Sequence, residues 1–165
     1  FARENRQVML EVVKERLAGK LPGIEFSGEV NAHHNYAAVE RHYGKEVWVH
    51  RKGAIRAGEG ETGIIPGAMG SFSYIVKGKG NPESFCSCSH GAGRSLGRRQ
   101  ARERFSVEKT MVDLKELGVI LGKQNKRDVS EESRFAYKDI NFVISQQLDL
   151  IEPVKKLKTI AVIKG

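Results

Sequence analysis

The sequence predicts an α+β protein, with mixed strands at its centre and helices outside. Apolar residues recur at helical spacing within 2–18 and again from 107 to 117. Apolar and polar residues alternate over 45–57, as they do in a strand with one buried face. β-Branched residues are frequent from 154 to 164, which favours a further strand. These patterns favour an α+β fold, but they do not give the order of its strands.

The first half of the chain is predicted to hold one helix and several strands joined by glycine-rich turns. The helix covers 2–18 and ends at Gly19. The segments that follow are a short strand over 23–30, a strand over 45–57 that forms half of a hairpin, a loop over 58–72, a strand over 73–77 and an irregular stretch over 78–89.

The second half of the chain is predicted to be more helical. The strongly basic stretch from Arg94 to Phe105 predicts one helix, and Ser106 can cap a second helix that ends at Gly118. Asp139 can cap a third helix, which Pro153 stops. The remaining segments are a polar loop over 125–133 and a final strand over 154–164.

Composition describes a globular chain with an excess of positive charge. The 165 residues hold 28 Lys+Arg and 20 Asp+Glu, so the formal net charge is +8. No stretch reaches the roughly 18 apolar residues of a membrane span, so no membrane association is expected. Two cysteines and no signal peptide favour a cytoplasmic location. Because the chain begins at Phe1 within helix-like sequence, we expect residues 1–165 to be a single unit cut from a longer protein.

The stretch Ser89-His90-Gly91-Ala92-Gly93-Arg94 is the sharpest candidate for chemistry. Glycines before a helix let backbone N–H groups face a phosphate, and the arginines that follow can bind phosphate oxygens. A histidine at that position can act as an acid, a metal ligand or a nucleophile towards phosphorus. From the spacing alone, a basic helix after a glycine turn with a structural histidine is an equally good interpretation.

Two further segments are weaker candidates. Paired imidazoles at His33-His34-Asn35 suit Mn, Fe or Zn, although adjacent residues of a strand point to opposite faces, so one of the two is the expected ligand. The small residues from Pro66 to Ser73 permit close approach of a nucleotide, although the loop lacks the Gly-Lys-Ser/Thr of a P-loop. A loop pair of histidines and an ordinary glycine-rich turn are the alternatives.

The spacing of the cysteines limits the metal sites that can be expected, and the positive charge indicates the kind of partner. Cys86 and Cys88 with His90 could bind a soft metal, but no second cysteine pair is present, so two spectator thiols are favoured. The run His50-Arg51-Lys52 with Arg56 is either a solvated edge or part of a track for a polyanion. Together with the net charge and the arginine-rich helix, this run favours a nucleic-acid partner.

Taken in order along the chain, these segments resemble the RtcB family of RNA-splicing ligases. The matching stretches are His33-His34-Asn35-Tyr36, Val49-His50-Arg51-Lys52-Gly53-Ala54, Pro66-Gly67-Ala68-Met69-Gly70, Ser73-Tyr74, Ser89-His90-Gly91-Ala92-Gly93-Arg94, Ala136-Tyr137-Lys138-Asp139 and Ala161-Val162-Ile163-Lys164-Gly165. They follow the family's order and spacing across nearly all of the chain. One such motif is weak, but the ordered set is highly specific.

The resemblance implies a GTP- and manganese-dependent RNA ligase, with mixed β-sheets around a nucleotide and metal pocket and flanking helices. Such enzymes join RNA that ends in a 3′-phosphate or a 2′,3′-cyclic phosphate to RNA with a 5′-hydroxyl. They act in tRNA splicing and RNA repair. The implied partners are GTP, RNA such as tRNA halves, and in some cases a helper protein.

Site residues follow from the resemblance by position. His90 matches the histidine that becomes guanylylated, His34 matches a manganese ligand next to the guanylate, and Asn35 matches a guanylate contact. The rest of the implied guanylate-binding set is Pro66, Gly67, Ala68, Met69, Ser73, Gly91, Ala92, Gly93, Tyr137 and Lys164. Arg94 and Arg98 are candidates to hold RNA phosphates.

The implied mechanism starts with attack of His90 on the α-phosphorus of GTP. The guanylate then passes to the RNA 3′-phosphate, and the 5′-hydroxyl displaces GMP. Because the family's other metal ligands lie upstream of this region, we expect the parent protein to be active and the isolated 165 residues to have little or no activity. A non-catalytic basic RNA-binding module and a metal-dependent phosphohydrolase, which needs paired carboxylates near the histidines, are the alternatives.

Overall fold

The computed structural model describes residues 2–122 and 128–163. By its internal contacts the chain forms two compact units, Phe1–His33 and His34–Gly165, and each is described by itself. Among the described residues, no helix is both long and apolar enough to cross a membrane.

The first unit is built on helix α1, Ala2–Lys20, which confirms the predicted helix. The segment after it is held to the helix by side chains: Arg6 donates to Asn31 at 2.9 Å, and Lys14 pairs with Glu29 at 3.1 Å. The predicted strand over 23–30 is wrong, because these side-chain contacts hold the segment against a helix, and no neighbouring strand pairs with it.

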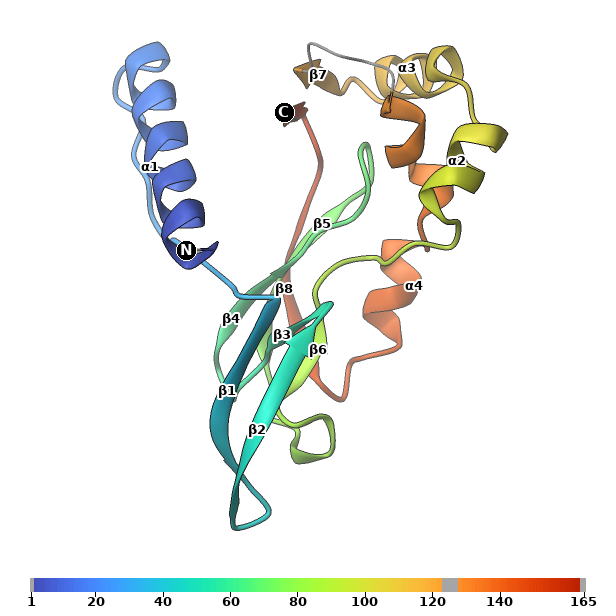
Figure 1. The fold of residues 1–165 in the computed structure, drawn as a ribbon. Helices are drawn as coiled ribbons and strands as arrows, with labels where there is room; N and C mark the ends of the chain where they lie inside the picture. The colour runs from blue at the N-terminus through green and yellow to red at the C-terminus, as the bar shows by residue number, and fades with distance from the viewer. Residues whose placement is uncertain (1, 123–127, 164–165) are drawn as a thin grey trace. The chain divides into compact units, whose positions relative to one another are not determined.

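Within its described residues, 34–122 and 128–163, the second unit holds four small sheets, most of whose strands are labelled in Figure 1. They are the antiparallel hairpin of β1 (Asn35–His42) and β2 (Lys45–Lys52), the antiparallel pair of β3 (Ala54–Arg56) and β6 (Ser87–Ser89), the antiparallel sheet of β4 (Thr62–Ile65), β5 (Ser73–Gly78) and β8 (Ile151–Leu157) in the order β4-β5-β8, and the parallel pair of β7 (Ile120–Gly122) and β9 (Ala161–Ile163).

Helices accompany the sheets in this unit, so the α+β prediction is confirmed. They are α2 (Arg98–Arg104), α3 (Val107–Glu116) and α4 (Ile140–Ser145), with 3-10 turns η1 (Pro82–Ser84), η2 (Val129–Glu132) and η3 (Arg134–Ala136). Both predicted caps are confirmed, since the side chains of Ser106 and Asp139 accept bonds from the amides of Lys109 and Asn141.

A hydrophobic cluster joins α3 to the loop that precedes β5. Met69, Leu114, Val119 and Val129 are buried there, and Val162 of β9 packs against them. This cluster fixes the 66–73 loop, because Met69 lies in the middle of that loop and cannot leave without exposing its side chain. The loop is therefore set by long-range packing as well as by its glycines.

Several predicted boundaries differ from the structure in the first half of this unit. The predicted strand over 45–57 is broken at Gly53 into β2 and β3. The predicted loop over 58–72 contains strand β4, whose pairing with β5 outweighs its glycine content. The stretch over 78–89 contains η1 and strand β6, which pairs with β3.

Two further boundaries differ in the second half. Helix α2 begins at Arg98 and not at Arg94, because Gly97 is its N-cap, with extended backbone and with its amide bonded to the Gln100 side chain. Arg94 instead forms an isolated β-bridge with Tyr137. Pro153 does not stop a helix but lies within β8 beside a bulge, where proline is tolerated. The final predicted strand is split into β8 and β9, and part of the polar loop over 125–133 lies outside the described residues.

Candidate functional site

His34 and His90 lie next to each other, although more than fifty residues separate them. His34 precedes β1 and His90 follows β6, and the amide of Gly53 donates to the carbonyl of His34 at 3.0 Å. The two imidazole rings are stacked, with centroids 5.4 Å apart and planes inclined by 19°. Asn35 begins β1 beside this pair and is exposed. His33 belongs to the other unit.

Gly53 separates β2 from β3 and lies against the His90 ring. Its φ is +77°, a conformation that residues with a side chain adopt at a cost. A Cβ atom at Gly53 would lie 3.6 Å from Cε1 and 3.8 Å from Nδ1 of His90. The glycine therefore leaves open the space along one edge of the imidazole.

The residue before His90 is held by a buried side chain that the sequence did not single out. Gln147 is 6% exposed, and its Oε1 accepts from the Ser89 amide at 3.0 Å. Its Nε2 donates to the Ser89 hydroxyl at 2.7 Å. The two bonds fix the backbone that carries His90. Gln147 follows a short helix with no motif around it, so no sequence signal could have found it.

The His90 loop is tied to the loop that starts at Pro66. The amide of Ala92 donates to the Pro66 carbonyl at 3.0 Å, and a Cβ atom on Gly91 would approach that oxygen to 3.1 Å. Gly67 allows the second loop to turn, because a Cβ atom there would lie 2.3 Å from the Phe72 carbonyl oxygen. The two motifs predicted to share a ligand are therefore adjacent.

A small cavity of about 230 Å³ opens beside these loops. Its lining residues are Gly67, Ala68, Met69, Ser73, Glu132, Tyr137, Thr159 and Val162. Five of them belong to the predicted guanylate-binding set, and Val162 lies in the closing motif of the resemblance. Glu132 and Thr159 were not predicted and carry no motif. Lys164 lies outside the described residues.

Tyr137 forms one wall of this cavity and is fixed from two sides. Its hydroxyl donates to Glu132 at 2.7 Å and accepts from Arg94 at 2.9 Å. The Arg94 guanidinium also lies over the tyrosine ring, 4.7 Å from the centroid. Burial and the hydrogen bond to Glu132 raise the pKa of Tyr137, so the phenol stays protonated.

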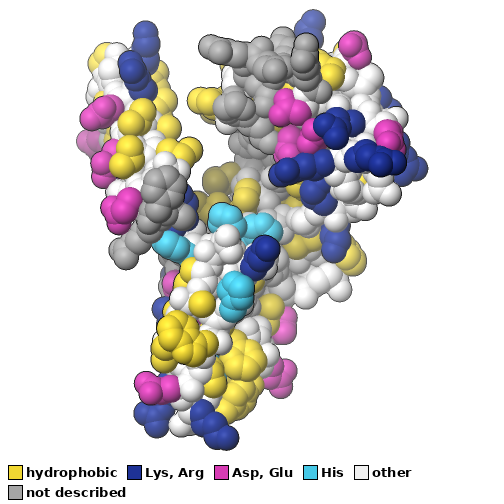
Figure 2. All heavy atoms as spheres, viewed as in Figure 1, with side chains coloured by type: hydrophobic (Ala, Val, Ile, Leu, Met, Phe, Trp, Pro, Cys, Tyr) yellow, Lys and Arg dark blue, Asp and Glu magenta, His cyan; other side chains and the backbone are white. Residues whose placement is uncertain are grey.

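The two arginines predicted to hold RNA phosphates differ in exposure. The Arg94 side chain is 24% exposed and donates to the backbone carbonyls of Leu96 and Glu131 as well as to Tyr137. The Arg98 side chain is 74% exposed and lies 3.9 Å from Glu131. Figure 2 shows Lys and Arg side chains gathered over α2. The arginines of that helix are Arg98, Arg99, Arg102 and Arg104.

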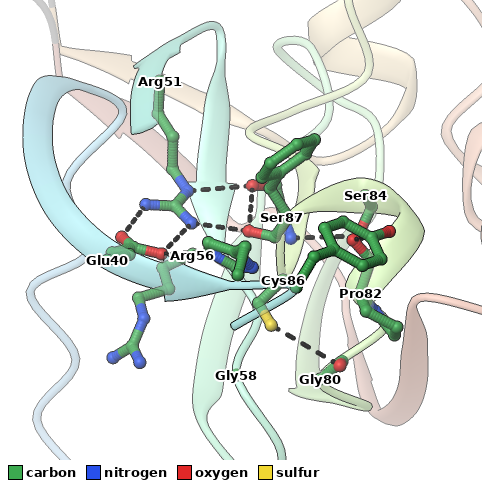
Figure 3. Close-up of polar contacts among 12 residues, drawn as sticks. Glu40, Arg51, Arg56, Gly58, Gly80, Pro82, Ser84, Cys86 and Ser87 are labelled. Carbon is green, nitrogen blue, oxygen red and sulfur yellow. Dashed lines mark hydrogen bonds and ion pairs between the residues drawn. The ribbon is translucent and has the colours of Figure 1, made fainter. Parts of the chain in front are cut away.

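Arg51, in the predicted basic run, is buried, with an exposure of 2%. Figure 3 shows its guanidinium between Glu40 and Ser87. It donates to both Glu40 oxygens, to the Ser87 hydroxyl at 2.9 Å and to the Phe85 carbonyl at 2.8 Å. Hydrogen bonds from Arg51 lower the pKa of Glu40 to about 2. Arg51 therefore anchors the hairpin to β6, whereas His50, Lys52 and Arg56 of the run face solvent.

The described residues, 2–122 and 128–163, contain no group of three or more His, Cys, Asp or Glu that could hold a metal ion. Cys88 is buried, and burial raises the pKa of its thiol to about 11. Glu40, a carboxylate close in sequence to His33 and His34, accepts hydrogen bonds from Arg51. His34 and His90 are two neighbouring imidazoles, and within the described part of the chain no third residue of these types joins them in such a group.

A stacked histidine pair, a glycine-rich loop tied to it and a net charge of +8 are compatible with a protein that binds phosphate groups. The comparisons with known proteins then give the family. All of residues 1–165 match the family described as tRNA-splicing ligase RtcB, and the chain belongs to that family.

Similar proteins come from bacteria and archaea. The chain is 43% identical over 171 residues to the RNA-splicing ligase RtcB of Escherichia coli K12, covering 100% of this chain and 41% of that protein. It is 36% identical over 190 residues to the tRNA-splicing ligase RtcB of Nanoarchaeum equitans, covering 100% and 40%. It therefore spans about two fifths of the length of the curated relatives that it matches.

Proposed function

We propose that this chain carries the nucleotide-activating half of an RNA ligase, in which His90 becomes guanylylated. The ligase joins RNA with a 3′-phosphate or 2′,3′-cyclic phosphate end to RNA with a 5′-hydroxyl, as in tRNA splicing and RNA repair. Family membership over the whole chain supports the ligase assignment. The single observation that carries the role of His90 is its stacking on His34, on a loop that Ala92 ties to the Pro66 loop.

In the proposed reaction, a ring nitrogen of His90 attacks the α-phosphorus of GTP. A P–N bond forms, the bond from that phosphorus to the bridging oxygen breaks, and pyrophosphate leaves. An oxygen of the RNA 3′-phosphate then attacks the same phosphorus, and the P–N bond breaks to restore the imidazole. Finally the 5′-hydroxyl attacks the RNA phosphate, loses its proton and displaces GMP.

The small cavity is the proposed site of the guanosine. Gly67 to Met69 offer backbone groups, Ser73 offers a hydroxyl, and the fixed Tyr137 offers a ring for the base. The bond from Ala92 to Pro66 ties the loop that carries His90 to the loop that borders this cavity. Lys164 and Asn35 complete the proposed guanylate contacts. Arg98, with its exposed side chain, and Arg94 are the proposed contacts to RNA phosphates.

Manganese is the proposed metal, and His34 is its proposed ligand in this chain. An imidazole is a donor that manganese accepts, but one donor does not make a site, and the described residues supply no group of three. When bound, the metal would neutralise phosphate charge. The 165 residues are therefore proposed to work as part of one catalytic domain with an upstream segment, in the cytoplasm, and to have little activity alone.

Covalent labelling tests the proposal directly. α-Labelled GTP and Mn²⁺ are incubated with the 165-residue chain and with a chain extended upstream to the length of its relatives. We expect label on the extended chain after denaturing electrophoresis, and its loss in His90→Ala. The matched control is His50→Ala, because His50 is exposed on β2 and should not change labelling. Label that persists on His90→Ala overturns the assignment. RNA binding without label in either chain supports the non-catalytic module instead.

A further inference from the structure

A second, larger cavity lies next to the first. It has a volume of about 510 Å³, and it shares Tyr137 and Thr159 with the smaller cavity. The 66–73 loop borders both, with Gly67 to Met69 and Ser73 on the small cavity and Gly70 to Phe72 on the large one. The large cavity falls within the usual size range for sites that hold a small organic ligand.

Three aromatic rings line the large cavity, and each carries a cation over one face. Lys156 lies 4.0 Å from the centroid of Phe72, Arg134 lies 4.8 Å from that of Phe135, and Arg94 lies 4.7 Å from that of Tyr137. The cation leaves the opposite face of Phe72 and of Tyr137 for stacking, whereas Phe135 also has Lys109 5.8 Å from its centroid. Walls of this kind suit a flat ring such as a nucleobase.

The cavity also has positive charge at its rim. Lys138 and Lys158 line it, both are exposed, and within residues 2–122 and 128–163 neither forms an ion pair. Arg134, in contrast, is held by Asp113 at 2.8 Å. The one carboxylate on the lining, Asp139, accepts the bonds that cap α4. Two ammonium groups beside aromatic walls match a ligand that has both a base and a phosphate.

We propose that the large cavity holds one nucleotide of the single-stranded RNA substrate, with its base on Phe72 or Phe135 and its phosphate near Lys138 and Lys158. This inference rests on the proposed function in one respect, namely that the neighbouring small cavity holds the guanosine. Because Tyr137 is a wall of both cavities, the RNA nucleotide lies beside the guanylate to which its 3′-phosphate becomes joined.

The test measures RNA binding by fluorescence anisotropy, with the 165-residue chain and a labelled single-stranded RNA decamer that ends in a 3′-phosphate. Phe72→Leu and Phe135→Leu keep an apolar side chain but remove the ring, and the variant that removes the stacking ring should weaken binding about tenfold. Lys158→Gln should lower the slope of log Kd against log salt by about one. Two variants are used at the aromatic wall because Phe135 also packs on Phe105, which thermal unfolding checks.

The matched controls are Trp48→Leu and Lys45→Gln, which change an exposed ring and an exposed lysine on β2, away from the cavity. Both should leave RNA affinity unchanged. Equal loss of affinity in the controls, or none in Phe72→Leu and Phe135→Leu, overturns the inference. GMP binding that depends on Phe72 while RNA affinity does not would also overturn it, since the cavity would then take a free nucleotide.

Guanylate labelling of the extended chain separates this inference from the proposed function. If His90 is labelled and the cavity variants bind RNA normally, the inference fails alone. If RNA binding depends on the cavity but no label forms on His90, the proposed function fails and the cavity assignment stands. Label that survives in Phe72→Leu, with weakened RNA binding, supports both.

Discussion

The side-chain amide of Gln147 bonds Ser89 at two atoms, across a sequence separation of 58 residues. Its oxygen accepts from the Ser89 amide and its nitrogen donates to the Ser89 hydroxyl, so one buried group satisfies both polar groups of the residue before His90. A buried side chain held by two hydrogen bonds has little conformational freedom, so it also restricts the backbone to which it is bonded. The orientation of His90 is thus set partly from the end of α4.

Replacement of this amide should loosen the His90 loop. Gln147→Leu leaves the Ser89 amide without its partner, and we expect a loss of about 1–3 kcal/mol in the free energy of unfolding. Labelling by α-labelled GTP in the extended chain should fall as well. Gln146→Leu is the control, because Gln146 is an exposed neighbour. Chemical denaturation and labelling measure both effects. A variant that loses stability and labels at the parent's rate would show that Gln147 has only a structural role.

Gly53 and Gly44 offer a matched pair of substitutions. Their φ values are +77° and +76°, so an alanine at either position should cost a similar amount, about 1–2 kcal/mol. Only at Gly53 would the new Cβ contact His90, since nothing lies within 4 Å of a Cβ at Gly44. We therefore expect equal stability losses, with slower guanylate labelling in Gly53→Ala only. Equal labelling rates for the two variants would contradict a role for the open edge of the His90 ring.

The ion pair of Arg51 and Glu40 should make stability depend on pH in the acid range. The pKa of Glu40 is lowered from 4.5 to about 2 by hydrogen bonds from Arg51. A lowered folded-state pKa adds stability that is fully present above about pH 4.5 and is lost as the pH falls towards 2. The loss should reach about 3 kcal/mol at most. Urea denaturation at a series of pH values measures it.

Two variants separate this pair from general acid denaturation. Glu40→Gln removes the titrating group, so it should lower stability at neutral pH and flatten the dependence between pH 4.5 and 2. Glu46→Gln changes an exposed carboxylate on β2 and should keep the parent's dependence. A slope in Glu40→Gln that equals that of the parent would assign the effect to other carboxylates.

The two cysteines should differ in reactivity. Cys88 is 4% exposed, and burial raises the pKa of its thiol to about 11, so at pH 8 only about one molecule in a thousand carries the thiolate there. Cys86 is only partly buried. Brief treatment with iodoacetamide at pH 8, followed by peptide mass analysis, should modify Cys86 and leave Cys88 free. Equal modification of both would show that β6 opens readily.

The sequence predicted the start of a helix well where bonds between residues close in sequence determine it. Ser106 and Asp139 cap their helices by bonds that span two or three residues, and such bonds can be read from sequence. Long-range contacts decided the rest. Arg94 forms a β-bridge with Tyr137 instead of helix, and Pro153 lies beside a bulge in β8. The pairing with Tyr137 and the bulge have no local signal, although Gly97 and Gln100 mark the true start of α2.

The residues of the candidate site likewise fall into those that a sequence motif predicts and those that only tertiary packing brings to the site. The resemblance gave His34, His90 and five residues of the small cavity by position. In the structure the two histidines stack on each other and the five residues line the cavity. Gln147 and Thr159 lie in no motif and reach the site only through tertiary packing. Arg51 was assigned to a solvated edge or a polyanion track, because a basic run in sequence does not show that a guanidinium faces inward to Glu40.

The parallel pairing of β7 with β9 has a consequence for synthesis on the ribosome. Val162 of β9 supplies a wall of the small cavity, and β9 is translated after every other element of the second unit. A nascent chain whose residues 161–163 have not yet left the ribosome therefore lacks one wall of the cavity. A ligand of that cavity cannot assist the folding stages that come before. Parallel pairing of distant segments is also slow. Ligand rescue of a folding-defective variant should accordingly act only after translation has passed Val162.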